Sequence, residues 1–235
     1  MKIDLSHNTK ALTFDLFGTV LDLGGSLKPY IQNFLNNHNS KISSDIFWNQ
    51  LRYRQRIEQY QDSLIDIGHS GYLETAKKAF IYTSKLNNLE ANDIDIKSFM
   101  DGWNYLSPFP ECVNSMNKLS EKYNLVALSN GDLYFLEHLV KNRIKFDFDK
   151  IISVDEVGYF KPKPGVYRKA AHNLNMEPNE IIMVSANSFD VMGARTCGLR
   201  GIYVNRYNLP FEETIEKYKP DIIVSDFSEL LTVLS

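Results

Sequence analysis

The feature that most constrains the fold is an alternation of short apolar segments and helical segments in the half of the chain after Pro110. The apolar, β-prone runs cover residues 124–129, 151–154, 181–185, 202–204 and 222–224, and stretches with helical character cover residues 132–142, 164–174 and a segment that stops at Gly198. Strands that alternate with helices form a parallel sheet with helices on its faces. We therefore expect an α/β fold with a doubly wound parallel sheet.

One more apolar strand precedes Asp15, the most informative single residue. The run 12–14 is β-prone, and the strand stops at Gly18-Thr19, where the glycine permits a sharp turn. Ligands of open parallel sheets bind at the carboxyl ends of the strands. A carboxylate in that place can attack carbon or phosphorus and form a covalent ester. The alternative is that Asp15 only caps the next helix or turn.

The segment from Gly24 to Leu106 has a different pattern. Its apolar residues follow helical spacing and strand signals are scarce, as in the series Phe47, Leu51, Ile57, Tyr60 and Leu64. About four helices are expected, inserted just after the Asp15 turn and returning at a proline-rich junction, 107–110. We expect a Rossmann-like core domain formed by residues 1–23 and 107–235, and a helical cap domain formed by residues 24–106. The cap is expected to act as a lid that excludes water.

Composition excludes several classes of function. The 235 residues carry a net charge of −3, so no basic field for nucleic acid is present. No apolar run approaches 18 residues, and Met1–Lys10 lacks the apolar segment of a signal peptide. Cys112 and Cys197 lie far apart and are expected to be buried free thiols, as in a cytoplasmic protein. The five histidines are scattered, so a histidine-rich metal site is not expected.

Three further polar motifs follow predicted strands. They are Ser129-Asn130-Gly131, a lysine loop at Lys161-Pro162, and the stretch 185–190, which ends in Asp190. Taken singly, each has an ordinary explanation, namely a helix cap for the first and last and a solvated surface lysine for the second. All four motifs fall at strand carboxyl ends, however, which favours a common site.

In content and order, these motifs resemble those of the haloacid dehalogenase superfamily, which also carries a helical cap after its first motif. Most members resemble Mg-dependent phosphatases, which have a second Asp two residues after the nucleophile and acidic metal ligands in the last loop. This sequence has Phe17 and Ala186 at those positions. Phenylalanine cannot protonate a leaving alkoxide, and alanine cannot bind a hard cation. Both differences argue against phosphoryl transfer.

The residues that remain resemble the L-2-haloacid dehalogenase branch. The matching positions are Asp15, Phe17, Gly18 and Thr19 in the first motif, Ser129, Asn130 and Gly131 in the second, Lys161, Pro162 and Tyr167 in the third, and Ser185, Asn187, Phe189 and Asp190 in the fourth. The cap of that branch supplies an arginine, and Tyr53-Arg54-Gln55-Arg56 makes Arg54 the candidate. Arg52 and Arg56 are close enough that the helix phase can favour either of them.

The resemblance and the residue types together suggest hydrolysis of short L-2-haloalkanoic acids with inversion, without a metal or other cofactor. Asp15 would be the nucleophile and Thr19 would orient it, while Lys161 would keep it ionised. Halide leaves without a proton, so Phe17 can stand in place of an acid. The remaining assignments are Ser129 and the backbone near Leu16 for the substrate carboxylate, Arg54, Asn130 and Phe189 for the halide, Asp190 and Asn187 for the hydrolytic water, and Ser185 and Tyr167 as tethers of Lys161.

Three other functions remain open at this stage. They are a Mg-dependent phosphatase, a hydrolase of a strained ring that carries a 2-carboxylate, and a non-catalytic protein that binds a small anion. The family resemblance also suggests a homodimer, with neither nucleic acid nor a membrane as partner.

Overall fold

The computed structural model describes residues 8–66, 68–211 and 215–235, so most of the polar stretch Met1–Lys10 lies outside the described residues. The chain forms two compact units. Met1–Leu21 and Pro108–Ser235 form one, called here the core unit, and Asp22–Ser107 form the other, called the helical unit. The short strands β2 (Leu21–Asp22) and β3 (Ser107–Pro108) pair with each other where the chain passes between the two units.

The core unit is built on a six-stranded sheet in the order β5-β4-β1-β6-β7-β8. All neighbouring strands run parallel. The strands are β1 (Ala11–Phe14), β4 (Asn124–Ser129), β5 (Lys150–Ser153), β6 (Ile181–Ser185), β7 (Arg200–Val204) and β8 (Ile222–Val224). Strands β1 and β6 are buried along their whole length, as expected for a sheet covered on both faces.

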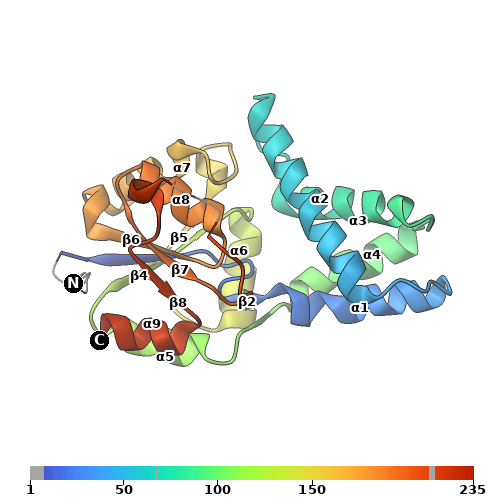
Figure 1. Cartoon of the computed structure of the whole chain (residues 1–235), viewed down its shortest axis with the longest axis horizontal. Coiled ribbons are helices and arrows are strands. Elements are labelled where there is room, and N and C mark those ends of the chain that lie inside the picture. Colours follow the sequence, from blue (N-terminus) through green and yellow to red (C-terminus); the bar gives the residue numbers. More distant parts are fainter. Residues whose placement is uncertain (1–7, 67, 212–214) are drawn as a thin grey trace. The chain divides into compact units, whose positions relative to one another are not determined.

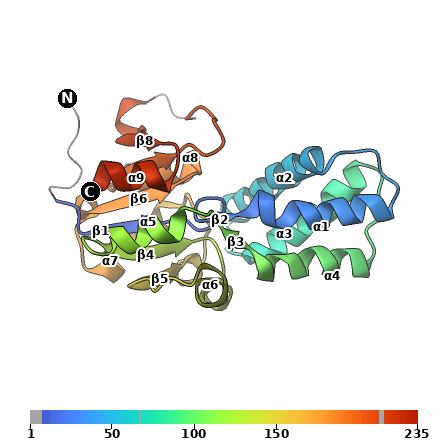
Figure 2. The same ribbon diagram turned by 90° about the horizontal axis from the view of Figure 1, so that it is seen from below.

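Helices cover both faces of this sheet, with α5 and α9 on one side and α7 and α8 on the other (Figures 1 and 2). The core helices are α5 (Cys112–Leu119), α6 (Leu133–Leu139, continued by a π-helical turn at Val140–Ile144), α7 (Pro164–Leu174), α8 (Ser188–Thr196) and α9 (Phe227–Leu234). The predicted α/β class and doubly wound parallel sheet are confirmed.

The strand order explains why the sequence motifs meet. The central strand β1 leads into Asp15, and its two neighbours are β4, which ends at Ser129, and β6, which ends at Ser185. Gly18, at a φ of +86°, makes the turn after β1, and its N–H donates to the carbonyl of Leu21 at 3.0 Å. Three of the four polar loops therefore leave the sheet side by side at one edge.

The helical unit consists of α1 (Leu23–Asn37), α2 (Ser44–Leu64), α3 (Tyr72–Leu86) and α4 (Asp93–Asp101, continued by a 3₁₀ turn at Gly102–Tyr105). Its core is aromatic, since the rings of Phe80 and Phe99 stack with centroids 4.4 Å apart and Phe34 meets Phe80 edge-on at 5.0 Å. Side-chain caps begin three of these described helices, at Asp22 for α1, at Ser43 for α2 and at Asn92 for α4.

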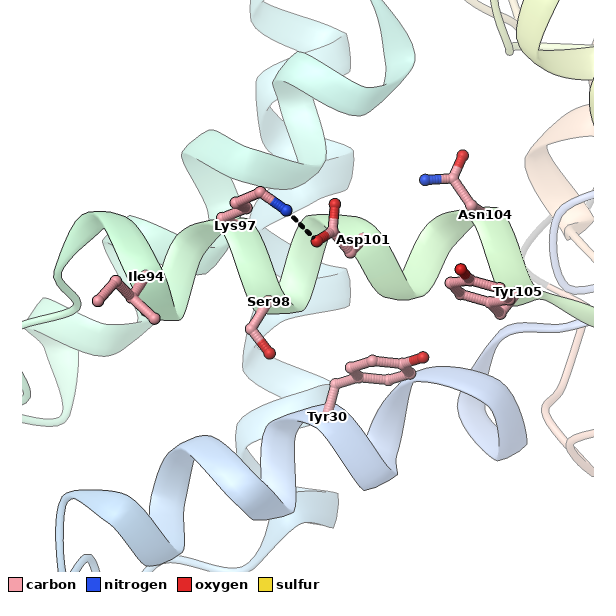
Figure 3. Close-up of a pocket in the computed structure, with 7 residues that line it drawn as sticks. All are labelled: Tyr30, Ile94, Lys97, Ser98, Asp101, Asn104 and Tyr105. Atoms are coloured by element: carbon pink, nitrogen blue, oxygen red, sulfur yellow. Dashed lines mark hydrogen bonds and ion pairs between the residues drawn. The ribbon is translucent and has the colours of Figure 1, made fainter.

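A surface pocket of about 530 Å³ lies within the helical unit (Figure 3). Tyr30 of α1 and residues of α4 and the following turn line it, with Lys97 paired to Asp101 at 2.5 Å. Ile94 and Tyr105, which also line it, are exposed. None of the site residues predicted from the sequence lies in this pocket.

Most strand positions agree with the sequence pattern, and two other expectations need correction. The helix predicted at 132–142 ends as an α-helix at Leu139, because the chain then widens into the π-helical turn. Cys112 is buried as expected, but Cys197 is only partly buried because it lies at the end of α8, where its Sγ meets the carbonyl of Pro164 at 3.5 Å. No helix in the described part of the chain combines the length and apolar character needed to cross a bilayer.

Candidate active site

The carboxylate of Asp15 is nearly inaccessible to solvent, at 5 % exposure, and its two oxygens have different surroundings. Oδ2 accepts hydrogen bonds from the Thr19 hydroxyl at 2.8 Å and from the Asn187 amide at 2.9 Å. Oδ1 has a longer contact, 3.4 Å, with the ammonium of Lys161. Asp15 does not cap a helix. It lies in the turn after β1, with its N–H bonded to the carbonyl of Val184.

Lys161 is a buried cation rather than a solvated surface lysine, with an exposed fraction of 1 %. Its Nζ donates to Asp190 Oδ2 at 2.9 Å and to the carbonyl of Leu128, in addition to its contact with Asp15. Its backbone N–H donates to Asn130 Oδ1 at 2.8 Å, which joins the second and third motifs. A buried ammonium between two carboxylates has its charge compensated.

Asp190 and Tyr167 complete this network beneath Lys161. The Tyr167 hydroxyl donates to Asp190 Oδ1 at 2.7 Å. Burial raises the pKa of Tyr167 well above its usual value, and the negative charge of Asp190 adds to the effect, so the phenol keeps the proton that it donates. Helix α8 has Gly193 where it passes this ring, because a Cβ there would lie 2.7 Å from the Tyr167 hydroxyl oxygen.

The fourth motif reaches Asp15 through Asn187, whose amide also contacts the carbonyl of Phe17 at 3.4 Å. Ser185 Oγ accepts the N–H of Asn187 at 3.1 Å, and Tyr167 bonds to Asp190. Ser185 therefore supports Asn187, a partner of Asp15, and Tyr167 supports Asp190, a partner of Lys161. The Lys161 ammonium itself is held by the Leu128 carbonyl and by Asp190.

Ser129 and the aromatic residues supply the rest of the predicted set. Ser129 is fully buried, and its hydroxyl has no hydrogen-bond partner among the described residues. Phe17 is buried and stacks on Phe135, with ring centroids 6.1 Å apart. Phe189 is partly exposed in the first turn of α8, and the carbonyl of Leu16 accepts the N–H groups that close the turn after β1.

Burial raises the pKa of Asp15 above its usual value, and this effect is larger than the opposing effect of the Lys161 charge. The charge of Asp190 raises it further, while the hydrogen bond from Thr19 lowers it. Lys161 thus favours the ionised form, as expected from the sequence, but desolvation outweighs it. An ionised Asp15 in this setting is stabilised by protein donors and by Lys161 in place of bulk water.

The donor set around Asp15 does not fit magnesium well. Mg²⁺ takes near-octahedral oxygen ligands, with carboxylates prominent among them. Phe17 and Ala186 offer no side-chain oxygen, and the backbone N–H of Ala186 donates to Thr19 Oγ1 at 2.8 Å. Both oxygens of Asp190 already accept hydrogen bonds, from Lys161 and from Tyr167.

Within the helical unit, the arginines of α2 differ in their partners. Arg54 forms an ion pair with Glu58 at 2.5 Å and lies over the ring of Tyr82 at 4.1 Å. Arg52 donates to two neutral groups, Gln55 Oε1 and the Tyr72 hydroxyl. Gln55 is fully buried, and its Nε2 has no partner in the described part of the chain. The charge of Arg54 is therefore compensated by its own helix, whereas the groups bonded to Arg52 leave its charge available.

The sequence analysis did not predict two contacts, one to Lys161 and one to the turn that carries Asp15. The carbonyl of Leu128 bonds Lys161, and Arg206, just after β7, donates from Nε to the carbonyl of Thr19 at 3.0 Å. A backbone carbonyl gives no signal in a sequence. Arg206, however, follows a predicted strand, 202–204, and the rule applied to the other four motifs points to it as well.

Comparison with known proteins agrees with this geometry. The sequence profile of haloacid dehalogenase-like hydrolases matches residues 9–198. The chain is 27 % identical to (S)-2-haloacid dehalogenase 1 of Pseudomonas sp. strain CBS-3, over 96 % of each chain. It is 30 % identical to an (S)-2-haloacid dehalogenase of Xanthobacter autotrophicus, over 80 % of this chain and 72 % of that one.

Solved structures agree as well. A crystal structure of an L-2-haloacid dehalogenase superposes with a TM-score of 0.87 at 26 % identity, covering 97 % of this chain and 99 % of the other. The family expected from the motifs is thus confirmed. The chain belongs to the haloacid dehalogenase-like hydrolases and, within them, to the L-2-haloacid dehalogenase branch.

Proposed function

We propose that this protein hydrolyses the carbon–halogen bond of short L-2-haloalkanoic acids and releases halide and a 2-hydroxy acid of inverted configuration. The observation that carries the proposal is the arrangement of Asp15. Its Oδ2 is fixed by two donors, and the hydrogen-bond donor that the described residues place on its Oδ1 is the more distant Lys161 ammonium at 3.4 Å. Phe17 stands where a leaving-group acid would be required for phosphate ester cleavage.

In the first step, Asp15 Oδ1 attacks the α-carbon. A bond forms between Oδ1 and that carbon while the carbon–halogen bond breaks, and halide departs with the bonding electrons. Oδ1 is the better nucleophile of the two oxygens because strong hydrogen bonds to Oδ2 withdraw electron density from it. The hydroxyl of Ser129, which is buried and has no hydrogen-bond partner within residues 8–66, 68–211 and 215–235, is suited to donate to the substrate carboxylate.

In the second step, water adds to the carbonyl carbon of the Asp15 ester. The acyl C–O bond breaks and the hydroxy acid leaves with one proton of the water. The other proton passes through the base to solvent, so the carboxylate of Asp15 is restored with one oxygen from water. We assign Asp190 and Asn187 to positioning or activating this water. Because both Asp190 oxygens already accept hydrogen bonds, taking up the water proton requires one of those bonds to weaken.

We further propose that an arginine of α2 receives the halide. The sequence motif indicates Arg54 for this role. Arg54, however, is already paired with Glu58, whereas Arg52 donates to the neutral Tyr72 hydroxyl, and this difference favours Arg52. A weakly hydrated halide is best received by a guanidinium whose charge is not already compensated.

The direct test is halide release from L-2-chloropropionate and from haloacetates, with a chelator present. We expect turnover that the chelator does not change and that Asp15→Asn abolishes. A single turnover in ¹⁸O-labelled water should place the label in Asp15, detectable by mass spectrometry of the peptide that contains it. Absence of halide release by the folded protein would reject the proposal.

Parallel assays with other substrates separate the other candidate functions. A magnesium-dependent phosphatase would hydrolyse p-nitrophenyl phosphate and lose that activity with the chelator. A strained-ring hydrolase would open azetidine-2-carboxylate, and an anion-binding protein would be stabilised by haloacids without turning them over.

A further inference from the structure

Arg206, which lies outside the four motifs of the core unit, has several partners. Its guanidinium donates to the carbonyl of Thr19 at 3.0 Å and to Cys112 Sγ at 3.1 Å, and it pairs with Glu111 at 2.6 Å. The ring of Phe109 lies 3.9 Å from its central carbon. With a side-chain exposure of only 7 %, the guanidinium is fixed on several sides.

The next residue reinforces the same turn. The hydroxyl of Tyr207 donates to the carbonyl of Gly18 at 3.1 Å. Two successive carbonyls of the turn after β1, those of Gly18 and Thr19, therefore accept hydrogen bonds from two successive side chains after β7. The loop that follows β7 holds the backbone of the turn that carries Asp15.

This backbone contact continues to the carboxylate. The Thr19 hydroxyl donates to Asp15 Oδ2 at 2.8 Å and accepts the N–H of Ala186 at 2.8 Å. Because the hydroxyl is used as donor and acceptor at once, its direction is set and only the position of the Thr19 backbone can vary. That position is what Arg206 holds.

We propose that Arg206 is a positioning residue for the nucleophile, acting through the Thr19 carbonyl to keep the Thr19 hydroxyl on Asp15 Oδ2 and Oδ1 free to attack. The inference rests on the proposed function for its kinetic consequence and on geometry alone for its effect on Asp15. Misplacement of a reacting group by about 1 Å can cost about 100-fold in rate, which gives the expected scale.

The kinetic test compares Arg206→Met with Thr19→Val and with the double variant. We expect Arg206→Met to lower kcat about 10- to 100-fold and to leave KM within about twofold, because Arg206 is not one of the residues proposed to bind the substrate. The double variant should be no slower than Thr19→Val alone, since both changes remove the same contact. Multiplied losses in the double variant would overturn the inference.

A matched control shows whether the loss comes from general destabilisation. Arg195 is another partly buried arginine of the core unit, paired with Asp221 at 2.9 Å and 22 % exposed. Arg195→Met should lower the melting temperature and leave kcat unchanged. If Arg206→Met does not fold, two milder variants replace it in the test. Glu111→Gln removes the ion pair that holds the guanidinium, and Arg206→Lys keeps the positive charge but lacks the planar set of N–H donors. Wild-type kcat in both would overturn the inference.

A measurement without substrate separates this inference from the proposed function. The Asp15 carboxyl can be titrated by ¹³C NMR, assigned by its absence in Asp15→Asn. Since the Thr19 hydrogen bond lowers the pKa of Asp15, both Arg206→Met and Thr19→Val should raise it, and Arg195→Met should not. If the wild-type protein releases no halide but this titration responds, the proposed function fails and the positioning role stands. An unchanged titration in folded Arg206→Met would overturn that role.

Discussion

Replacing Lys161 with methionine is the perturbation that tests the site most severely. The change removes the positive charge that lies 3.4 Å from Asp15 Oδ1 and 2.9 Å from Asp190 Oδ2, at a position with 1 % exposure. Methionine keeps the length of the side chain and much of its volume. The effects that follow therefore report the charge and its hydrogen bonds.

Coulomb's law gives the scale of the loss. At an effective dielectric constant of about 20, a unit pair at either of these separations interacts by roughly 5 kcal/mol before solvation is counted. Breaking a buried pair by removing one partner costs roughly 3–5 kcal/mol. Since about 1.4 kcal/mol is a factor of ten, kcat/KM at neutral pH should fall at least about 100-fold in Lys161→Met. The pKa of Asp15 should rise, because the ammonium lowers it in the wild-type protein.

The assay is halide release as a function of pH, together with the free energy of unfolding. Lys161→Met should be strongly destabilised, because it leaves two buried carboxylates without a cation. The double variant Lys161→Met/Asp190→Asn removes one of those charges and should recover much of the stability but none of the activity. Near wild-type turnover by Lys161→Met at neutral pH would refute the reasoning.

Further predictions concern the substrate pocket, the arginines and the pH profile. Ser129→Ala should leave stability unchanged or slightly raised, because the described part of the chain gives the buried hydroxyl no partner, while KM for L-2-chloropropionate rises about 10- to 100-fold. Arg52→Ala should lower kcat/KM more than Arg54→Ala does, and the opposite order in the same kinetics would return the role to Arg54. Since burial raises the pKa of Asp15, kcat/KM should be lost as pH falls through a value above the pKa of an ordinary aspartate. Because the charge of Asp190 also raises that pKa, Asp190→Asn should shift the acidic side of the pH profile to lower pH, measured on the residual activity.

The sheet was predictable because its central strands are buried on both faces and its edge strands are still apolar. Such strands read as short apolar runs, and 124–129, 181–185 and 222–224 are strands with those bounds in the structure, although Ile223 of the edge strand β8 is exposed. The end of α6 was not predictable, because Val140–Ile144 keeps helical spacing while the hydrogen bonding changes to a π-helical turn. Periodicity reports which face is apolar and does not report the hydrogen-bond register.

The candidate site was predictable to the extent that its chemistry resides in side chains. Asp15, Lys161, Asn187 and Asp190 come together as expected from their places at strand ends, because β1 lies between β4 and β6. Which partner each of them meets depends on ångström-scale placement. Tyr167 therefore reached Asp190 rather than Lys161, and the Leu128 carbonyl, which has no sequence signal, became a partner of the ammonium.

The balance of charge at Asp15 shows why residue types alone do not fix reactivity. From sequence, a lysine near the aspartate indicates a lowered pKa, and the Lys161 contact does act in that direction. Burial acts in the opposite direction and is larger, and its size depends on how closely the surrounding chain packs around the carboxylate. The packing that makes Asp15 harder to ionise also keeps bulk water from its carboxylate once it is ionised. The reactivity of this aspartate is therefore set jointly by one buried cation and by apolar packing, and of these two only the cation and the direction of its effect can be recognised in the sequence.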